Sequence, residues 1–242
     1  MRRISAETDR PLVCAGETQG QIGAVRMRIV VTGTDPGLAE RLRVEGLEAV
    51  EYPLVRIEVL DGPPVRADLY DWVVLTSRNA VDALWRRLEG PLPRVAAVGP
   101  GTAEALRARG VEPALVAARS TQEGLAEELP RPAGRVLFAG AEGARDVLVR
   151  ELRADFVPLY RTTELRPAAP PEGDLVVLAS PSAARALAAT GSRLPCVSIG
   201  PLTSAEAERR GLTVAGEADT HDREGLVRAV KLAASRAGSS PS

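Results

Sequence analysis

Short apolar runs recur along the chain, and amphipathic helical patterns separate them. The runs do not alternate with polar residues, which is typical of parallel strands that are covered on both faces. The pattern therefore predicts an α/β fold. The predicted strands lie near residues 28–33, 48–52, 72–76, 94–98, 113–117, 135–139, 155–159, 174–179, 195–199 and 212–215, with helices between them.

Part of this pattern occurs twice. The segments VVLTS at 73–77 and AVGPGT at 97–102 return as VVLAS at 176–180 and SIGPLT at 198–203. The copies are circularly permuted, because RIVVTG near the start of the chain matches RVLFAG in its middle. A discontinuous first domain explains this order.

The permutation predicts where the chain crosses between two α/β domains. We predict a first domain of 27–52 plus 167–235, a second of 60–157, and a linker ribbon of 53–59 and 158–166. Because the chain crosses twice between the two domains, we predict that two segments form the hinge between them.

Both ends of the chain lack helical or strand periodicity. We expect residues 1–26 and 236–242 to be disordered. A chain that begins at Met27, a plausible alternative start, is expected to fold.

Composition narrows the class of protein. The 242 residues are 45% apolar and carry a net charge of −1, which suits one large core or two modest ones and no nucleic-acid partner. No apolar stretch approaches the ~18 residues of a membrane helix. Cys14 and Cys196 lie far apart and form neither a disulfide framework nor a CxxC metal site. We predict a cytoplasmic monomer.

Scarce histidine and lysine limit the chemistry. His221 and Lys231 are the only residues of their types, which disfavours a Ser-His-Asp triad and a His-rich zinc site. No phosphate-binding GxxxxGK[ST] motif occurs, and Glu104 replaces the third glycine of a dinucleotide fingerprint. His221 aligns with Ser120, which opens a predicted capping box with Glu123. We therefore expect His221 to be a solvated residue near a helix start, and we expect no metal or cofactor.

Five motifs together resemble the uroporphyrinogen-III synthase family over about residues 27–230. They are TSRNAV at 76–81, AVGPGTA at 97–103, PLYRT at 158–162, SPS at 180–182 and IGP at 199–201. The resemblance implies two flavodoxin-like domains with parallel sheets, joined by a two-stranded linker. It also implies an enzyme without cofactors that cyclises the linear tetrapyrrole hydroxymethylbilane and inverts its ring D through a spiro intermediate.

The resemblance also implies a set of site residues. The substrate carries eight carboxylates, which N–H groups at helix N-termini can bind without a dense cationic patch. The implied substrate-binding residues are Thr76, Ser77, Arg78, Asn79, Gly99, Thr102, Ser180, Ser182, Gly200 and Thr203. The alternative is that the Ser and Thr residues only cap helices, a role worth about 1 kcal/mol each.

Tyr160 matches the family's tyrosine on the returning linker strand, which implies that it assists departure of the bilane hydroxyl. Its repeat partner is Val55, and this asymmetry favours a functional role over a structural one. Gly33 and Gly140 stand where many family members carry basic residues. Two alternatives remain: a non-enzymatic ligand-binding or regulatory module of the same fold, and a nucleotide-sugar enzyme built from two Rossmann-like domains.

Overall fold

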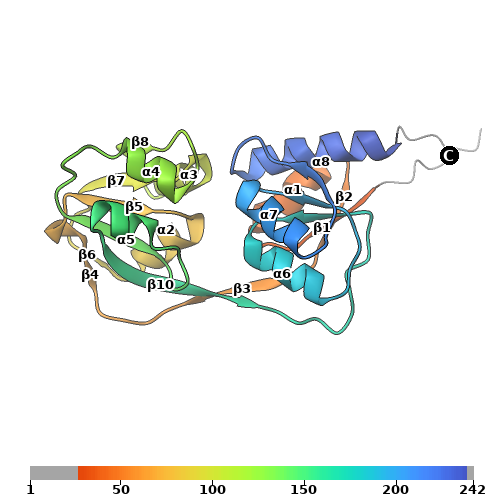
Figure 1. The fold of residues 1–242 in the computed structure, drawn as a ribbon, viewed down its shortest axis with the longest axis horizontal. Helices are drawn as coiled ribbons and strands as arrows, with labels where there is room; N and C mark the ends of the chain where they lie inside the picture. The colour runs from red at the N-terminus through yellow and green to blue at the C-terminus, as the bar shows by residue number, and fades with distance from the viewer. Residues whose placement is uncertain (1–26, 239–242) are drawn as a thin grey trace, which may run out of the picture.

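Residues 27–238 are described by the structure, a computed structural model, and their strands form two main sheets (Figure 1). Each predicted strand has a counterpart. Helices cover both faces of each sheet, as the unalternating apolar runs predict. The protein is thus an α/β protein in which parallel pairing dominates.

The first sheet has five strands, all paired in parallel, in the order β13-β12-β11-β1-β2. Their bounds are β1 Arg28–Val31, β2 Glu48–Glu51, β11 Leu175–Leu178, β12 Cys196–Ser198 and β13 Val214–Glu217. The helices α1 (Pro36–Val44) and α8 (Arg223–Gly238) cover one face, and α6 (Pro181–Ala189) and α7 (Pro201–Arg209) cover the other.

The second sheet has six strands in the order β3-β10-β9-β5-β7-β8. Their bounds are β3 Val55–Val59, β5 Trp72–Leu75, β7 Arg94–Ala97, β8 Leu115–Val116, β9 Val136–Ala141 and β10 Asp155–Glu164. Only β3 pairs antiparallel. The helices α2 (Arg78–Trp85) and α3 (Pro100–Arg107) cover one face, and α4 (Gln122–Glu128) and α5 (Val147–Leu152) cover the other.

The strands β3 and β10 form the ribbon between the two sheets (Figure 1). Within it Tyr160 pairs with Val59, and Glu164 pairs with Val55. The strand β10 also pairs with β9 in the second sheet, so it crosses the predicted boundary at 157 without a break. The returning part of the ribbon is therefore a direct extension of a sheet strand.

Two features were not predicted. The two-residue strands β4 (Val65–Arg66) and β6 (Leu88–Glu89) pair in parallel beside the short 3-10 helix η1 (Ala67–Leu69), and such elements are too short for a periodic signal. The helix α8 continues through Gly238, beyond our predicted boundary at 235. The rest of the predicted tails, 1–26 and 239–242, lies outside the described residues.

Two glycines end helices in matching places of the two halves. Gly110 follows α3 with φ of +78°, and Gly211 follows α7 with φ of +76°. Glycine adopts this left-handed conformation without the steric cost that a Cβ brings. Among the described helices, none combines the length and apolarity that crossing a membrane requires.

Candidate active site

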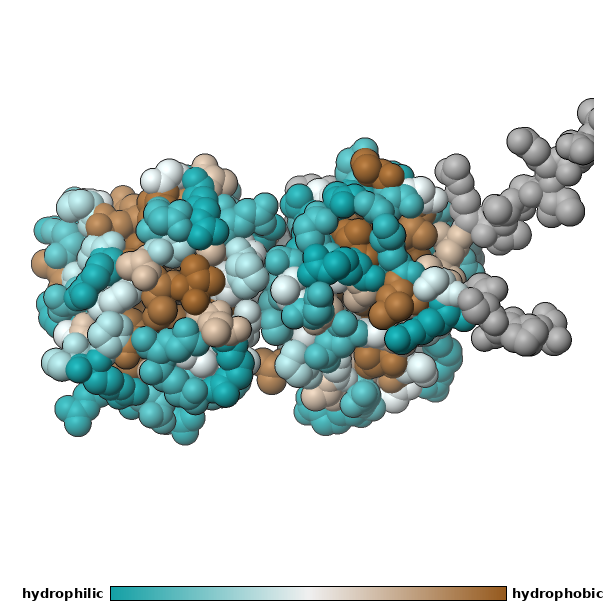
Figure 2. Space-filling model, turned by 90° about the horizontal axis from the view of Figure 1, so that it is seen from above, coloured by the Kyte–Doolittle hydropathy of each residue, from teal (hydrophilic) through white to brown (hydrophobic). Residues whose placement is uncertain are grey.

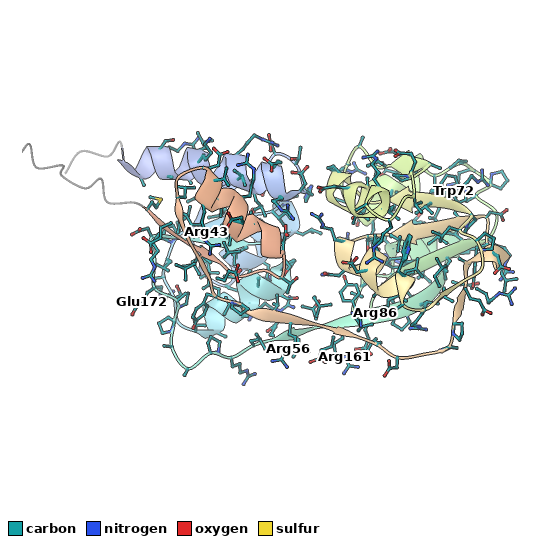
Figure 3. The ribbon with its side chains drawn as sticks, turned by 180° about the vertical axis from the view of Figure 1, so that it is seen from behind. Arg43, Arg56, Trp72, Arg86, Arg161 and Glu172 are labelled. Carbon is teal, nitrogen blue, oxygen red and sulfur yellow. The ribbon has the colours of Figure 1, made fainter. Side chains whose placement is uncertain are left out.

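A cavity of about 700 Å³ lies between the two sheets, at the carboxyl ends of their parallel strands. Figure 3 places Trp72, which begins β5, and Glu172, which precedes β11, at opposite outer ends of the molecule. The opposite ends of these two strands lead to Ser77 and Ser180, and both serines line the cavity. The two halves therefore present equivalent strand ends to one site.

The cavity is bounded on two sides by contacts between the halves. The ribbon runs along one side, and the start of α3 approaches the segment before α8 on the other (Figure 1). A Cβ on Gly101 would lie only 3.0 Å from the carbonyl oxygen of His221. Figure 2 shows that the two halves meet along a seam of mainly hydrophilic and neutral residues.

Most of the predicted site residues line this cavity. They are Thr76, Ser77, Arg78, Asn79, Gly99, Thr102, Tyr160 and Ser180. The remaining three, Ser182, Gly200 and Thr203, lie outside its described lining. The hydroxyl of Ser182 accepts from Arg185, and Thr203 is only 2% exposed.

Ser77 and Ser180 begin equivalent helices with the same geometry. Each has extended backbone angles, and each hydroxyl oxygen accepts from an N–H in the first turn: Ala80 at 3.0 Å and Ala183 at 3.2 Å. Such a cap satisfies an N–H group that has no partner within the helix. Both serines are therefore helix caps and cavity residues at once.

Gly99 and Gly200 make room for side chains rather than for a ligand alone. A Cβ on Gly99 would overlap the Ser120 side chain, and a Cβ on Gly200 would overlap the His221 ring. Ser120 and His221 are the repeat partners that the sequence aligned, and both line the cavity.

His221 is half-buried and lies two residues before α8, which agrees with its predicted place near a helix start. Its ring also packs on Gly200 and borders the cavity. The predicted capping box was displaced by one residue. The cap of α4 is Thr121, whose hydroxyl accepts from the Gly124 N–H at 3.0 Å.

Three arginines that line the cavity are each paired with a carboxylate. Arg223 donates to Asp35 at 2.7 and 2.9 Å, Arg145 donates to Glu123 at 2.5 and 3.0 Å, and Arg78 lies 3.4 Å from Glu104. The Asp35–Arg223 pair was not predicted from the sequence. The two residues are 188 positions apart, and no motif links them.

The pKa of Asp35 lies below its ordinary value of 3.8. Burial alone would raise this pKa, but hydrogen bonds from Arg223 and from the Gly37 N–H, together with the Arg223 charge, outweigh the burial. Asp35 also caps α1 through the Gly37 N–H at 3.1 Å. The ionised carboxylate thus stabilises the fold in two ways.

Asp35→Asn should lower the free energy of unfolding by about 1–3 kcal/mol at neutral pH, because asparagine keeps the cap but loses the ion pair. A depressed pKa contributes stability that is fully present above the unfolded-state pKa and is lost as pH falls through the folded-state pKa. The difference between parent and variant should therefore shrink below about pH 3.8, the unfolded-state pKa. Urea unfolding across this range measures it.

Asp219→Asn is the matched control, because Asp219 makes a similar two-bonded pair with Arg228 on the open surface. Solvent screens that pair, so the variant should unfold nearly as the parent does. Equal losses in both variants, or a difference for Asp35→Asn that does not vary with pH, would contradict this account.

Tyr160 is 6% exposed and projects from β10 into the same cavity. Burial raises the pKa of its phenol, and a hydrogen bond with Ser77 opposes that rise. The phenol is therefore neutral at physiological pH. Within residues 27–238 no group of three or more His, Cys, Asp or Glu side chains is placed to hold a metal ion.

Comparison with known proteins identifies the family to which this chain belongs. The family model described as Uroporphyrinogen-III synthase HemD matches residues 37–228. The chain belongs to the uroporphyrinogen-III synthase family. This family membership confirms the resemblance drawn from the five sequence motifs.

Two curated relatives are similar over part of their length. Uroporphyrinogen-III synthase of Synechococcus elongatus is 29% identical over 157 residues, which are 56% of this chain and 58% of that protein. Porphyrin biosynthesis protein HemD of Ruminiclostridium josui is 33% identical over 148 residues, which are 52% of this chain and 29% of that protein. The matches thus span less than two thirds of either relative.

Two solved structures of synthases share the fold. Uroporphyrinogen-III synthetase of Helicobacter pylori has a TM-score of 0.60 at 17% identity, and a mutant uroporphyrinogen III synthase of Thermus thermophilus has 0.58 at 16%. Each comparison covers 87% of this chain and 99% of the other. At such identities the likeness establishes the fold.

Gly33 and Gly140, the two positions where the resemblance implies basic residues in many family members, differ in their surroundings. Gly33 lines the cavity, and a Cβ there would lie 3.2 Å from the Ala179 Cβ. Gly140 lies outside the described lining, against the Phe138 ring. Of the two positions, only Gly33 belongs to the described cavity lining.

Proposed function

We propose that this protein is a uroporphyrinogen-III synthase that cyclises hydroxymethylbilane and inverts ring D through a spiro intermediate. The observation that carries the proposal is the cavity between the two halves, in which equivalent strand ends and one buried tyrosine converge. The proposed enzyme uses no cofactor or metal and acts as a cytoplasmic monomer.

The proposal includes the domain plan drawn from the repeats. The first sheet has the order β2-β1-β11-β12-β13, which in chain order is 2-1-3-4-5, the flavodoxin-like order. The second has the order β10-β9-β5-β7-β8, which becomes the same after the circular permutation. These orders support two flavodoxin-like domains with boundaries at 27–52 plus 167–235 and at 60–157, joined by the ribbon.

Main-chain groups at helix starts are the proposed carboxylate-binding groups. Gly99 is the N-cap residue of α3 and has no side chain that could cap the helix. Gly101 and Thr102, in the first turn of α3, also line the cavity. Uncapped N–H groups at a helix N-terminus attract anions. The three arginines are already paired with carboxylates, so substrate must compete for them. No described side chain caps the start of α3.

Tyr160 is the proposed catalytic residue. Its phenol would donate to the hydroxyl of the bilane as the carbon–oxygen bond breaks, and water and an azafulvene would result. A neutral buried phenol is a weak acid, so hydrogen bonding to the departing oxygen is its main contribution. Holding the flexible bilane so that the substituted carbon of ring D attacks supplies further rate enhancement.

A rate measurement tests the proposal against a binding module of the same fold. Catalytic amounts of protein should accelerate the consumption of hydroxymethylbilane over the spontaneous reaction. A binding module would instead protect one equivalent of bilane and leave the rest to cyclise at the spontaneous rate. That outcome would replace the enzyme assignment with the regulatory one.

A further inference from the structure

Among residues 27–238 the hydroxyl of Tyr160 has one hydrogen-bond partner, Ser77, and the Ser77 hydroxyl is itself held in place. The Tyr160 and Ser77 hydroxyl oxygens are 2.8 Å apart, and the Ser77 oxygen accepts from the Ala80 N–H at 3.0 Å. Tyr160 comes from β10 and Ser77 from the start of α2, so two elements of one domain are joined at this point.

Hydroxyl chemistry limits what each group can do. A serine oxygen has one proton to donate and two lone pairs, one of which here accepts from Ala80. When Ser77 donates to the phenolic oxygen, the proton of Tyr160 is left to point into the cavity. The chain of bonds from Ala80 through Ser77 to Tyr160 then runs in one direction, so that its members strengthen one another.

We propose that Ser77 is a positioning residue for Tyr160: its hydroxyl, anchored by the Ala80 N–H, donates to the phenolic oxygen as the phenolic proton moves toward the leaving group. This inference rests on the proposed synthase function of Tyr160. The carbon–oxygen bond of the bilane breaks, its hydroxyl takes the proton and leaves as water, and the charge left on Tyr160 is stabilised by Ser77. The pyrrole N–H of the bilane then loses its proton and Tyr160 regains one. The products of this step are the azafulvene, water and neutral Tyr160.

The other half of the molecule provides an internal comparison. Ser180 has the same extended backbone, and its hydroxyl caps α6 in the same way. The repeat partner of Tyr160 is Val55, which cannot form the hydrogen bond. The cap is therefore common to both halves, whereas the contact with a phenol belongs to Ser77 alone.

Electrostatics at Tyr160 agree with this role. Burial raises the pKa of Tyr160, and the hydrogen bond with Ser77 is the opposing influence. The charged residues that line the cavity are Asp35, Arg78, Asp82, Arg145, Asp222 and Arg223. No described hydrogen bond or ion pair joins any of these side chains to the phenol. Ser77 is thus the described group that favours negative charge on the phenolic oxygen.

Steady-state kinetics of Ser77→Ala, Ser77→Thr and Tyr160→Phe test the proposal. Ser77→Ala should lower kcat about tenfold, because a hydrogen bond to a developing charge is lost, and it should raise KM only as far as loss of the equivalent cap at Ser180 does. Ser77→Thr keeps the hydroxyl and should restore most of kcat. In the Tyr160→Phe background, Ser77→Ala should cause no further loss of kcat. Independent, multiplying losses would overturn the proposal.

Ser180→Ala is the comparison for loss of a cap. It removes the same helix cap at a residue that lines the cavity, so it should raise KM more than it lowers kcat. The same kcat loss in both serine variants would show that capping, and not contact with Tyr160, causes the effect.

A second measurement does not depend on turnover. Ring-¹³C tyrosine gives three signals, and Tyr160→Phe assigns the relevant one. Ser77→Ala should raise the pKa of Tyr160 by about one pH unit, as expected for loss of a donor to the phenolate. An unchanged Tyr160 pKa overturns the role of Ser77 even if the parent is an active synthase. An inactive parent with the expected rise would instead refute the proposed function and leave the Ser77–Tyr160 coupling established.

Discussion

Tyr160→Phe should lower kcat for hydroxymethylbilane cyclisation at least about tenfold, within the range for a positioned proton donor. KM should stay nearly constant, because the hydroxyl acts as the bilane hydroxyl departs and not when the ground state binds. The change leaves the ring in place, and the lost hydrogen bond with Ser77 should cost only about 1 kcal/mol of stability. Initial rates over a range of substrate concentrations separate kcat from KM.

Tyr70→Phe is the matched control for loss of a phenolic hydroxyl. Tyr70 follows the short helix η1 and lies outside the described cavity lining, and burial together with nearby Asp155 raises the pKa of its hydroxyl. Its kcat should equal that of the parent. If Tyr160→Phe instead unfolds more easily but keeps full turnover, then Tyr160 is a structural tyrosine and the proposed catalytic role fails.

Gly225→Ala should destabilise the protein by about 3 kcal/mol, since overpacking against fixed atoms is costly. A Cβ at this position in α8 would overlap the carbonyl oxygen of Thr220. That oxygen already accepts from the Asp222 N–H at 2.9 Å, so it cannot move without loss of a hydrogen bond. Thermal and urea unfolding should both reveal the loss. The shift would also displace His221, which lines the cavity, and should reduce turnover.

Gly143→Ala controls for the added methyl group. No atom lies within 4 Å of a Cβ at Gly143, and its φ is outside the left-handed region. Alanine there should change stability by no more than about 0.5 kcal/mol. Parental stability of Gly225→Ala would show that the turn before α8 is adaptable and would contradict the close packing described here.

Gly225 also separates what the sequence predicted from what only the structure explains. The repeat of EGL at 123–125 and 224–226 was visible in the sequence, but the reason for it was not. In both copies a Cβ would overlap the carbonyl oxygen of the residue five positions earlier, Arg119 or Thr220. The repeats and apolar runs predicted the strands and the circular permutation, because both depend on local pattern.

Contacts between distant segments could not be predicted in the same way. Asp35 and Arg223 meet because α1 and α8 cover the same face of the first sheet. The bond between Ser77 and Tyr160 depends on how β10 leaves its sheet, and the close approach of Gly101 to His221 depends on the angle between the halves. Each of these distances follows from tertiary packing, which no periodic pattern encodes.

The product formed from hydroxymethylbilane labelled with ¹³C at its hydroxymethyl carbon tests the central claim most directly. With catalytic protein, we predict that NMR and chromatography show uroporphyrinogen III, in which the labelled carbon joins the inverted ring D. Spontaneous closure without protein supplies the uninverted type I reference. If the protein binds the bilane but only type I product forms, at the spontaneous rate, then the cavity between the two halves is not a synthase site.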